Sequence, residues 1–182
     1  MSVRPYKQMI PELGKDVYID ESAQVIGKVE IGSNSSVWPN TTIRGDVNWI
    51  TIGANTSIQD GSVLHVTHDH TNKHPGGYPL AIGSQVTIGH NVVLHGCTIE
   101  DNCLIGMGAI ILDDAYLETN VFLAAGALVP PGKRLESGYL YVGSPVKRVR
   151  KLTQEEIEGL QYSADHYVKL KNDYLKMAEQ EK

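Results

Sequence analysis

Aliphatic residues recur every six positions through most of this chain, and this period restricts the fold more than any other feature of the sequence. An α-helix returns to the same face every 3.6 residues, and a long strand alternates every two residues without regular punctuation. Neither element by itself explains a period of six. The aliphatic positions are Val25, Ile31, Val37, Ile43, Ile52, Ile58, Leu64, Ile82, Ile88, Leu94, Ile99, Ile105, Ile111, Leu117, Leu123 and Val129.

Two further classes of residue accompany the period. Four places after most aliphatic positions the chain carries a second residue that can point inward, usually a small one: Val29, Ser35, Thr41, Val47, Thr56, Ser62, Val86, Val92, Thr98, Cys103, Ala109, Ala115, Val121 and Ala127. Between them stand glycines and asparagines, namely Gly27, Gly32, Gly53, Gly83, Gly89 and Gly106 with Asn34, Asn55, Asn91, Asn102 and Asn120. Short strands that bend every six residues fit this pattern, because Gly and Asn suit bends with positive φ.

Three such strands form one triangular coil of about 18 residues, and stacked coils pair their backbones in parallel. The predicted fold is therefore all-β, a parallel β-helix of hexapeptide repeats over residues 1–146. The hexapeptide pattern resembles that of left-handed β-helices. A β-sandwich has turns about every 8–12 residues and does not account for so regular a period.

The period is interrupted in two places and ends before the C-terminus. The segment from Ile43 to Ile52 is three residues too long, and residues 66–81 form an insertion that we expect to project as a loop. Residues 152–178 carry apolar side chains at spacings of three and four, which predicts an amphipathic helix packed alongside the β-helix in the same domain. Its stripe is Ile157, Leu160, Ala164, Tyr167, Leu170 and Tyr174.

The start of this helix has its own signals. Thr153 and Glu156 have the spacing of a capping box, in which each side chain bonds to the other residue's backbone. Just before them stand the basic residues Lys147, Arg148, Arg150 and Lys151. We expect a solvated connector here, with phosphate binding as the alternative.

Composition excludes several classes of function. The net charge of the 182 residues is −5 and no Lys/Arg-rich stripe is present, so we expect no nucleic-acid partner. No apolar run approaches the ~18 residues of a membrane span, and the first residues lack the apolar core of a signal peptide. Two cysteines, Cys97 and Cys103, give no disulfide framework. We therefore expect a cytoplasmic protein without a membrane partner.

Three histidines have the spacing of metal ligands. His65 follows Leu64 and His95 follows Leu94, and these positions lie one coil apart if the insertion is a loop. The two imidazoles should then stack on adjacent rungs, roughly 5 Å apart. His90 lies one strand earlier, and five extended residues span roughly 16 Å. One subunit would struggle to bring His90 to the other two, whereas a cyclic oligomer could supply it from the adjoining chain and leave a fourth position for water.

Other polar residues surround these histidines. Arg44, Asp46, Gln59 and Asp60 follow inward aliphatics on the strands before His65. Ion pairs at a subunit surface and a part in catalysis are equally compatible with them. The insertion carries His68, Asp69, His70 and His74, which could also bind metal, although loop histidines more often face solvent or relay protons.

These residues together resemble the γ-class carbonic anhydrases and their close relatives, over nearly the whole chain from about Arg4 to Tyr174. The resemblance is carried by Ile43-Arg44-Gly45-Asp46, by Ile58 to His65, by Ile88-Gly89-His90 through His95-Gly96-Cys97, and by Ser163-Ala164-Asp165-His166-Tyr167. It implies a left-handed β-helix homotrimer with one metal at each of its three interfaces. His65 and His95 would come from one subunit and His90 from the next. Zinc is the expected ion, with Fe(II) or Co(II) as alternatives for such ligands.

The resemblance also implies roles for the neighbouring residues and an activity. Arg44 would form ion pairs between subunits with Asp46 and Asp60, and would attract bicarbonate. Gln59 would bond the water on the metal, and Tyr167 would line the cavity. The activity implied is reversible hydration of carbon dioxide to bicarbonate by a hydroxide on the metal.

This sequence departs from the best-studied active members in the residues that move protons. Val47 follows Asp46 where a glutamate is expected soon after, and the loop lacks the family's glutamate shuttle. His68, Asp69 and His70 are the candidates for a relay in its place. Metal binding is therefore more strongly implied than rapid turnover. Two other functions fit the same scaffold: an acyl-CoA transferase or thioesterase, and a non-catalytic trimer stabilised by its metal.

Overall fold

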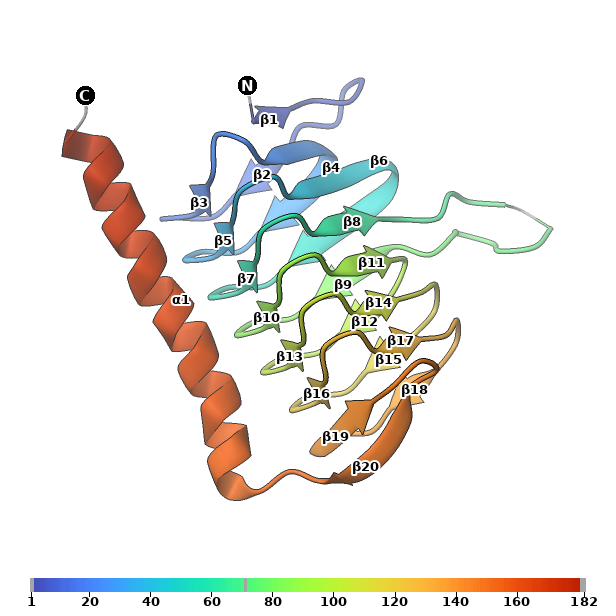
Figure 1. Ribbon diagram of the computed structural model, residues 1–182. Coiled ribbons are helices and arrows are strands. Elements are labelled where there is room, and N and C mark those ends of the chain that lie inside the picture. The colour runs from blue at the N-terminus through green and yellow to red at the C-terminus, as the bar shows by residue number, and fades with distance from the viewer. Residues whose placement is uncertain (1, 71, 181–182) are drawn as a thin grey trace.

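The computed structural model describes residues 2–70 and 72–180 and shows a triangular parallel β-solenoid with one long helix along its side (Figure 1). Apart from the antiparallel last strand, the strands pair in parallel with their counterparts one coil later, so three faces run the length of the solenoid. This arrangement confirms the predicted β-helix of hexapeptide repeats.

The strands divide among the three faces as follows. The first face holds β1 (Val3–Arg4), the first halves of β4 (Gln24–Ile31) and β6 (Thr42–Ile52), β8 (Val63–His65), β11 (Val93–His95), β14 (Ile110–Ile111) and β17 (Leu128–Val129). The second face holds β2 (Glu12–Leu13), the second halves of β4 and β6, β9 (Leu80–Ile82), β12 (Thr98–Ile99), β15 (Tyr116–Leu117) and β18 (Arg134–Leu135). The third face holds β3 (Tyr18–Ile19), β5 (Ser36–Val37), β7 (Ser57–Ile58), β10 (Thr87–Ile88), β13 (Leu104–Ile105), β16 (Phe122–Leu123), β19 (Tyr139–Val142) and the antiparallel β20 (Lys147–Lys151).

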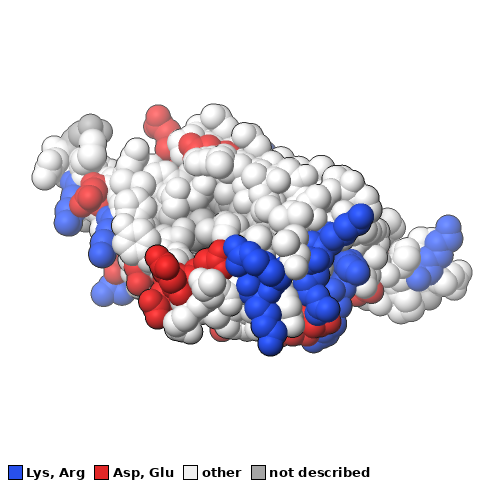
Figure 2. Space-filling view, turned by 60° about the horizontal axis from the view of Figure 1, so that its bottom comes forward, with Lys and Arg blue, Asp and Glu red and all other residues white. Residues whose placement is uncertain are grey.

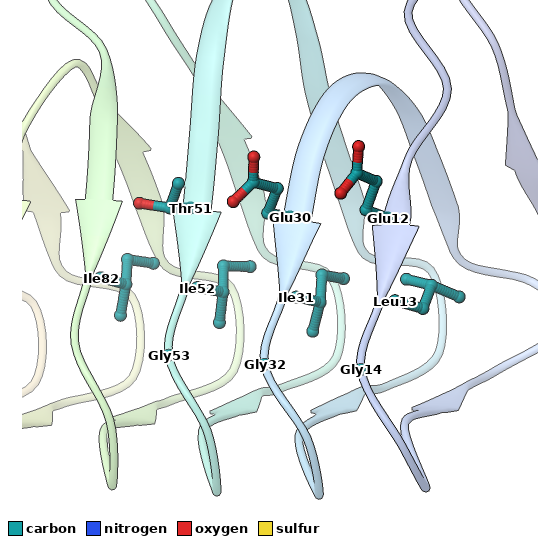
Figure 3. A pocket seen from close by; sticks show the side chains of 10 residues that line it. All are labelled: Glu12, Leu13, Gly14, Glu30, Ile31, Gly32, Thr51, Ile52, Gly53 and Ile82. Carbon is teal, nitrogen blue, oxygen red and sulfur yellow. The ribbon is translucent and has the colours of Figure 1, made fainter.

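The core is a stack of aliphatic side chains inside the coils. Every aliphatic position of the six-residue period is buried, and none is more than 3 % exposed. Figure 3 shows Ile31, Ile52 and Ile82 in line on neighbouring strands of the second face. The period therefore predicts the inward aliphatic residues correctly, because each coil repeats the backbone geometry of the coil before it.

Two of the smaller residues do not point inward as predicted. Val47 is 46 % exposed because it belongs to the three extra residues of β6, where the pairing with β4 shifts register. Thr98 is only partly buried, and Cys97 occupies the buried position in its place. The reason is that Leu94 and Ile99 are five rather than six residues apart, so the corner between β11 and β12 is one residue shorter.

The bends use asparagine and glycine for different purposes, which corrects the prediction that both supply positive φ. All five predicted asparagines have φ between 53° and 62°, and Gly27 has φ 83°. The other five predicted glycines have no positive φ. They are needed because coils approach closely there: a Cβ on Gly53 would lie 2.4 Å from the carbonyl carbon of Gly83 on the next coil.

Gly53→Ala should therefore destabilise the protein by about 1–3 kcal/mol, because backbone atoms of the next coil must move. The matched control is Gly159→Ala in the helix, where a Cβ meets nothing within 4 Å. That change should stabilise by about 0.5–1 kcal/mol, since alanine favours a helix interior. Urea unfolding of both variants measures the difference. Equal stabilities for Gly53→Ala and wild type would contradict close coil contact at this position.

Helix α1 (Gln154–Gln180) packs on the third face, against β3, β5, β7 and β10. It runs from the last coil back toward the first (Figure 1). Leu160 and Ala164 are buried, and Trp38 of the solenoid meets Tyr167 and Tyr174 at ring-centroid distances of 6.0 and 5.1 Å. The predicted packing of the helix is thus confirmed.

The buried stripe of α1 includes one residue that the apolar pattern missed. Lys171 is fully buried, and its Nζ donates a hydrogen bond of 2.7 Å to the carbonyl oxygen of Asp16 in the first coils. Burial lowers the pKa of Lys171, and the nearby Asp16 charge offsets this only in part. Its long apolar stem explains how a lysine can occupy a stripe of this kind.

Three predicted boundaries shift. The loop ends at residue 79, because Leu80 and Ala81 pair with Ile50 and Thr51 in β9. The helix extends to Gln180, and residues 147–151, expected as a connector, form β20 against β19. All five side chains of β20 are exposed, and Figure 2, which brings this end of the solenoid forward, shows Lys and Arg grouped with acidic side chains. No helix of the described residues has the length and apolar character needed to cross a membrane.

The capping box forms as predicted. The Glu156 backbone N–H donates to Thr153 Oγ1 at 3.2 Å, and the Thr153 N–H donates to Glu156 Oε2 at 2.9 Å. Arg150 adds two hydrogen bonds of 2.7 Å to the same carboxylate. The Arg150 bonds, with that of Thr153, lower the pKa of Glu156 from 4.5 to about 2.

Glu156→Gln should destabilise the protein at neutral pH, and the difference from wild type should shrink in acid. Because the pKa of Glu156 is lower in the folded than in the unfolded state, its contribution is complete above about pH 4.5 and is lost as pH falls toward about 2. Urea unfolding at a series of pH values measures this. Glu158→Gln, whose carboxylate accepts from Gln154, is the control. A difference that does not vary with pH would rule out the proposed role of the charge.

Candidate metal centre

His65 and His95 lie side by side at the ends of β8 and β11, at one edge of the first face. The two strands pair in register, with His95 opposite His65, and the ring centroids are 5.2 Å apart. His65 Nδ1 and His95 Nε2 face each other at 3.1 Å. The predicted stacking of these imidazoles on adjacent rungs is therefore confirmed.

A carboxylate holds the other nitrogen of each ring. Asp46 Oδ1 lies 3.0 Å from His65 Nε2, and Asp113 Oδ1 lies 2.7 Å from His95 Nδ1. Because an ionised carboxylate only accepts hydrogen bonds, the ring nitrogens facing it carry the protons. The two nitrogens that face each other are then left with lone pairs, so the arrangement favours a cation between them.

The electrostatics keep His65 and Asp46 in the protonation states that a metal requires. Burial lowers the pKa of His65, the Asp46 hydrogen bond opposes this, and the Arg44 and His95 charges add to the lowering. Burial would raise the pKa of Asp46, but its hydrogen bonds from His65 and Arg44 lower it overall. At neutral pH His65 is therefore neutral and Asp46 is ionised, and a neutral imidazole oriented by a carboxylate is the usual histidine ligand.

The geometry of the two imidazoles fits zinc. Two nitrogens each about 2.0–2.1 Å from one tetrahedral ion lie about 3.3 Å apart, close to the 3.1 Å found here. Within residues 2–70 and 72–180, no group of three or more His, Cys, Asp or Glu side chains is placed to hold an ion. One chain thus offers two nitrogen ligands, and a catalytic zinc site has three protein ligands.

His90 stands at the opposite edge of the first face, on the corner between β10 and β11. Its Nδ1 lies 2.9 Å from Asp60 Oδ2, not next to either of the other two histidines. The His90 side chain is 41 % exposed. The carboxylate of Asp60 orients His90 in the same way as Asp46 and Asp113 orient their histidines. Its Nε2 has no hydrogen bond within residues 2–70 and 72–180, so it can bind a ligand from outside the chain.

Gln59 and Tyr167 lie beside His90 rather than beside the His65–His95 pair. They line one cavity of about 230 Å³ with His90, Thr87 and Ser163, where the coils of β7, β10 and β13 meet α1. Thr87 and Ser163 share a hydrogen bond of 3.0 Å across this junction. Burial raises the pKa of Tyr167, and the Asp60 charge adds to it, so the phenol keeps its proton at neutral pH.

Arg44 lies with the His65–His95 pair and binds Asp46 within the same chain, Nη1 to Oδ2 at 2.5 Å. Asp60 lies with His90 at the other edge. The structure therefore divides the predicted site residues into two groups. Ion pairs of Arg44 between subunits stay a prediction.

Asp69 and His74 of the insertion form hydrogen bonds with other residues of the insertion. Asp69 Oδ1 accepts the backbone N–H of Gly76 at 2.9 Å, and His74 Nδ1 lies 2.9 Å from the Tyr78 hydroxyl. The rings of His68 and His70 lie 6.3 Å apart. A proton relay through His68, Asp69 and His70 stays a prediction.

Asp113 is the site residue that sequence reasoning missed. Its position contains a usable signal, because one coil here spans 17 residues, with Leu94 opposite Ile111, so Asp113 follows β14 at the same corner where His95 ends β11. A polar side chain at the same corner one coil beyond a predicted ligand is close enough to contact it, because adjacent parallel strands lie about 5 Å apart.

Comparison with known proteins gives the following similarities. The bacterial transferase hexapeptide family (six repeats) matches residues 11–45, 81–112 and 96–131. Protein YrdA of Escherichia coli (strain K12) is 54 % identical over 178 residues, which cover 98 % of this chain and 96 % of that protein. Mitochondrial gamma carbonic anhydrase 2 of Arabidopsis thaliana is 46 % identical over 160 residues, 88 % of this chain and 57 % of that protein.

Two further matches cover nearly the full length of both proteins. The carbonic anhydrase of Geobacillus kaustophilus (strain HTA426) is 39 % identical over 180 residues, 99 % of this chain and 94 % of that protein. Among solved structures, a hexapeptide transferase family protein from Anaplasma phagocytophilum has 41 % identity and a TM-score of 0.87, covering 94 % of this chain and 97 % of the other.

Proposed function

Because this chain belongs to the γ-carbonic-anhydrase-like family, we propose that it is a zinc-dependent carbonic anhydrase that converts carbon dioxide and water to bicarbonate reversibly. The observation that carries the proposal is the His65–His95 pair. Its facing ring nitrogens are 3.1 Å apart, and each outer nitrogen is held by a carboxylate.

The separation of the ligands supports a homotrimer. Each chain presents a two-histidine edge (His65 and His95) and a one-histidine edge (His90) on opposite sides of the first face. When one edge of a subunit binds the other edge of the next, the contact is head-to-tail, and such contacts close into rings. A ring of three gives one complete three-histidine site at each interface.

The surface between the two edges also supports contact with a second copy. Val63, Val93, Ile110 and Leu128 pair in one outward ladder along the first face, next to His65 and His95. Val63 and Ile110 are 43 % and 39 % exposed. An apolar ladder of this kind is typical of a subunit interface.

In the proposed reaction, each part is carried out by identifiable residues of this chain. A zinc ion held by His65, His95 and the next subunit's copy of His90 would lower the pKa of water to about 7 and so supply hydroxide at neutral pH. Gln59 and Tyr167 lie in the cavity beside His90 and would hydrogen-bond the reacting water and enclose the substrate. Arg44, 43 % exposed next to His65, provides a positive charge for bicarbonate.

The proposed metal is chosen from the type of ligands, and the proposed compartment from the free cysteines. Three imidazoles and an open position also suit Fe(II) and Co(II), so the proposal names zinc first and these as alternatives. Cys97 and Cys103 are buried, free thiols, and burial raises the pKa of both, so they remain unreactive. We place the protein in the cytoplasm, where free thiols persist.

Acyl transfer is the second candidate, favoured by the match to a family of hexapeptide transferases. His90 in its cavity would then act as a general base without a metal. A third possibility is a trimer in which the metal only stabilises the assembly. The number of metal ions per chain distinguishes a carbonic anhydrase from an acyl transferase. Measurable hydration of carbon dioxide distinguishes a carbonic anhydrase from a trimer that the metal only stabilises.

A mixing experiment tests the shared site. Homotrimers of His90→Ala and of the double variant His65→Ala/His95→Ala should each bind no zinc, because every interface lacks ligands. Unfolding and refolding the two together should restore zinc to about one quarter of the interfaces, where the intact edges of the two variants meet. Zinc is quantified by elemental analysis after desalting.

The matched control is His166→Ala, on the exposed side of α1, which should bind one zinc per chain. Full zinc content in the His90→Ala homotrimer, or no recovery of zinc in mixed trimers that sedimentation shows to have formed, would refute a site shared between subunits.

Carbon dioxide hydration should be measured on protein purified without oxygen, with metal quantified in the same sample. We expect activity in wild type and loss on metal removal with a chelator. Gln59→Ala should lower kcat/KM by about 10–100-fold, since it removes a group beside the metal ligand. Gln154→Ala, at the far end of α1, should leave kcat/KM unchanged. A zinc-loaded trimer without hydration activity would contradict the enzymatic proposal and favour the scaffold.

A further inference from the structure

The base of the 66–79 insertion is attached directly to the His65–His95 pair. We define the loop base as Thr67, Gly77 and Tyr78. Thr67 and Tyr78 exchange two backbone hydrogen bonds of 3.0 and 3.1 Å, so the two ends of the insertion are held together. The Asn48 amide donates to the carbonyl oxygens of Thr67 and Gly76 at 3.0 and 2.9 Å.

Asp113 joins this loop base to His95. One carboxylate oxygen, Oδ1, accepts from His95 Nδ1 at 2.7 Å, and the other, Oδ2, accepts from the Thr67 hydroxyl at 2.8 Å. Both oxygens of one side chain are therefore used, one by a candidate metal ligand and one by the loop base. Asp46 differs, because its second oxygen binds Arg44 rather than the insertion.

Packing around Gly96 gives a second, independent observation of the same junction. A Cβ on Gly96, which directly follows His95, would lie 2.3 Å from Asp113 Oδ1 and 2.7 Å from the Tyr78 Cβ. A Cβ on Gly77 would lie 2.2 Å from the Thr67 carbonyl oxygen. The backbone after His95, the Asp113 carboxylate and the loop base are thus in such close contact that a methyl group does not fit between them.

We propose that Asp113 is a positioning residue that couples the loop base to the metal site. Through Oδ1 it sets the orientation and tautomer of His95, and through Oδ2 it holds Thr67. This inference rests on the proposed function, since it assumes that His95 is a metal ligand. Coupling of this kind is reciprocal: if an ordered loop base favours metal binding, bound metal must order the loop base by the same free energy.

The test compares Asp113→Asn, Thr67→Val and the control Asp114→Asn in the assembled protein. Asp113→Asn keeps the shape and removes the charge, whereas Thr67→Val removes only the loop-side hydrogen bond. Asp114 is the exposed neighbouring carboxylate, so its change alters the net charge equally. Two properties are measured: zinc affinity by competition with a chromophoric chelator, and hydrogen exchange of the Thr67 and Tyr78 amides with and without zinc.

Asp113→Asn should bind zinc about 10–100-fold more weakly than wild type, the usual effect of changing a group that orients a metal-bound histidine. Thr67→Val should weaken zinc binding about fivefold or more, the lower range of measured coupling between sites. Zinc should slow exchange of the loop-base amides in wild type and in Asp114→Asn. In Thr67→Val that slowing should be lost.

Zinc affinity in Asp113→Asn equal to that in Asp114→Asn would overturn the positioning role. Unchanged zinc-dependent protection in Thr67→Val would overturn the coupling. In either case wild-type zinc binding would leave the proposed metal site standing. A wild-type trimer that binds no zinc, iron or cobalt would instead overturn the proposed function, and this inference with it.

Discussion

Parallel pairing between residues one coil apart is the constraint on which the rest of the structure depends. It places every inward aliphatic above its equivalent in the previous coil, so burial of one side chain fixes the positions of the next. The same pairing acts on the outer surface. Register places His95 opposite His65, and the next coil places Asp113 at the same corner, within hydrogen-bonding distance of His95. The scaffold and the candidate metal centre thus have one physical origin.

The two irregular segments of this solenoid lie at corners between its faces. The three extra residues of β6 and the 66–79 insertion both leave the solenoid near the His65–His95 edge. The first insertion brings Asp46 to His65, and the second brings Thr67 to Asp113. Irregular residues therefore supply the polar partners that a regular repeat does not contain.

The width of the first face explains why one chain does not bring His90 to His65 and His95. A strand separates His90 from His65 and His95, and the backbone between them is held straight by pairing on both sides. One ring nitrogen of each histidine is bonded within the chain, by Asp46, Asp60 or Asp113. Each edge is thus a preformed half of the proposed site, and the proposed assembly would bring the ligands together without rearranging the coil.

The sequence by itself determined the coil, its inward residues and the register of His65 with His95, because a period of six repeats the same local geometry in every coil. It also determined the helix start, since a capping box depends on contacts three residues apart. Only the tertiary structure decided four other features. These are the different roles of Asn and Gly at the bends, the strand at Lys147–Lys151, the buried Lys171 and the two contacts of the Asp113 carboxylate. Each depends on how closely separate coils, the insertion and α1 approach one another, and no local period encodes those distances.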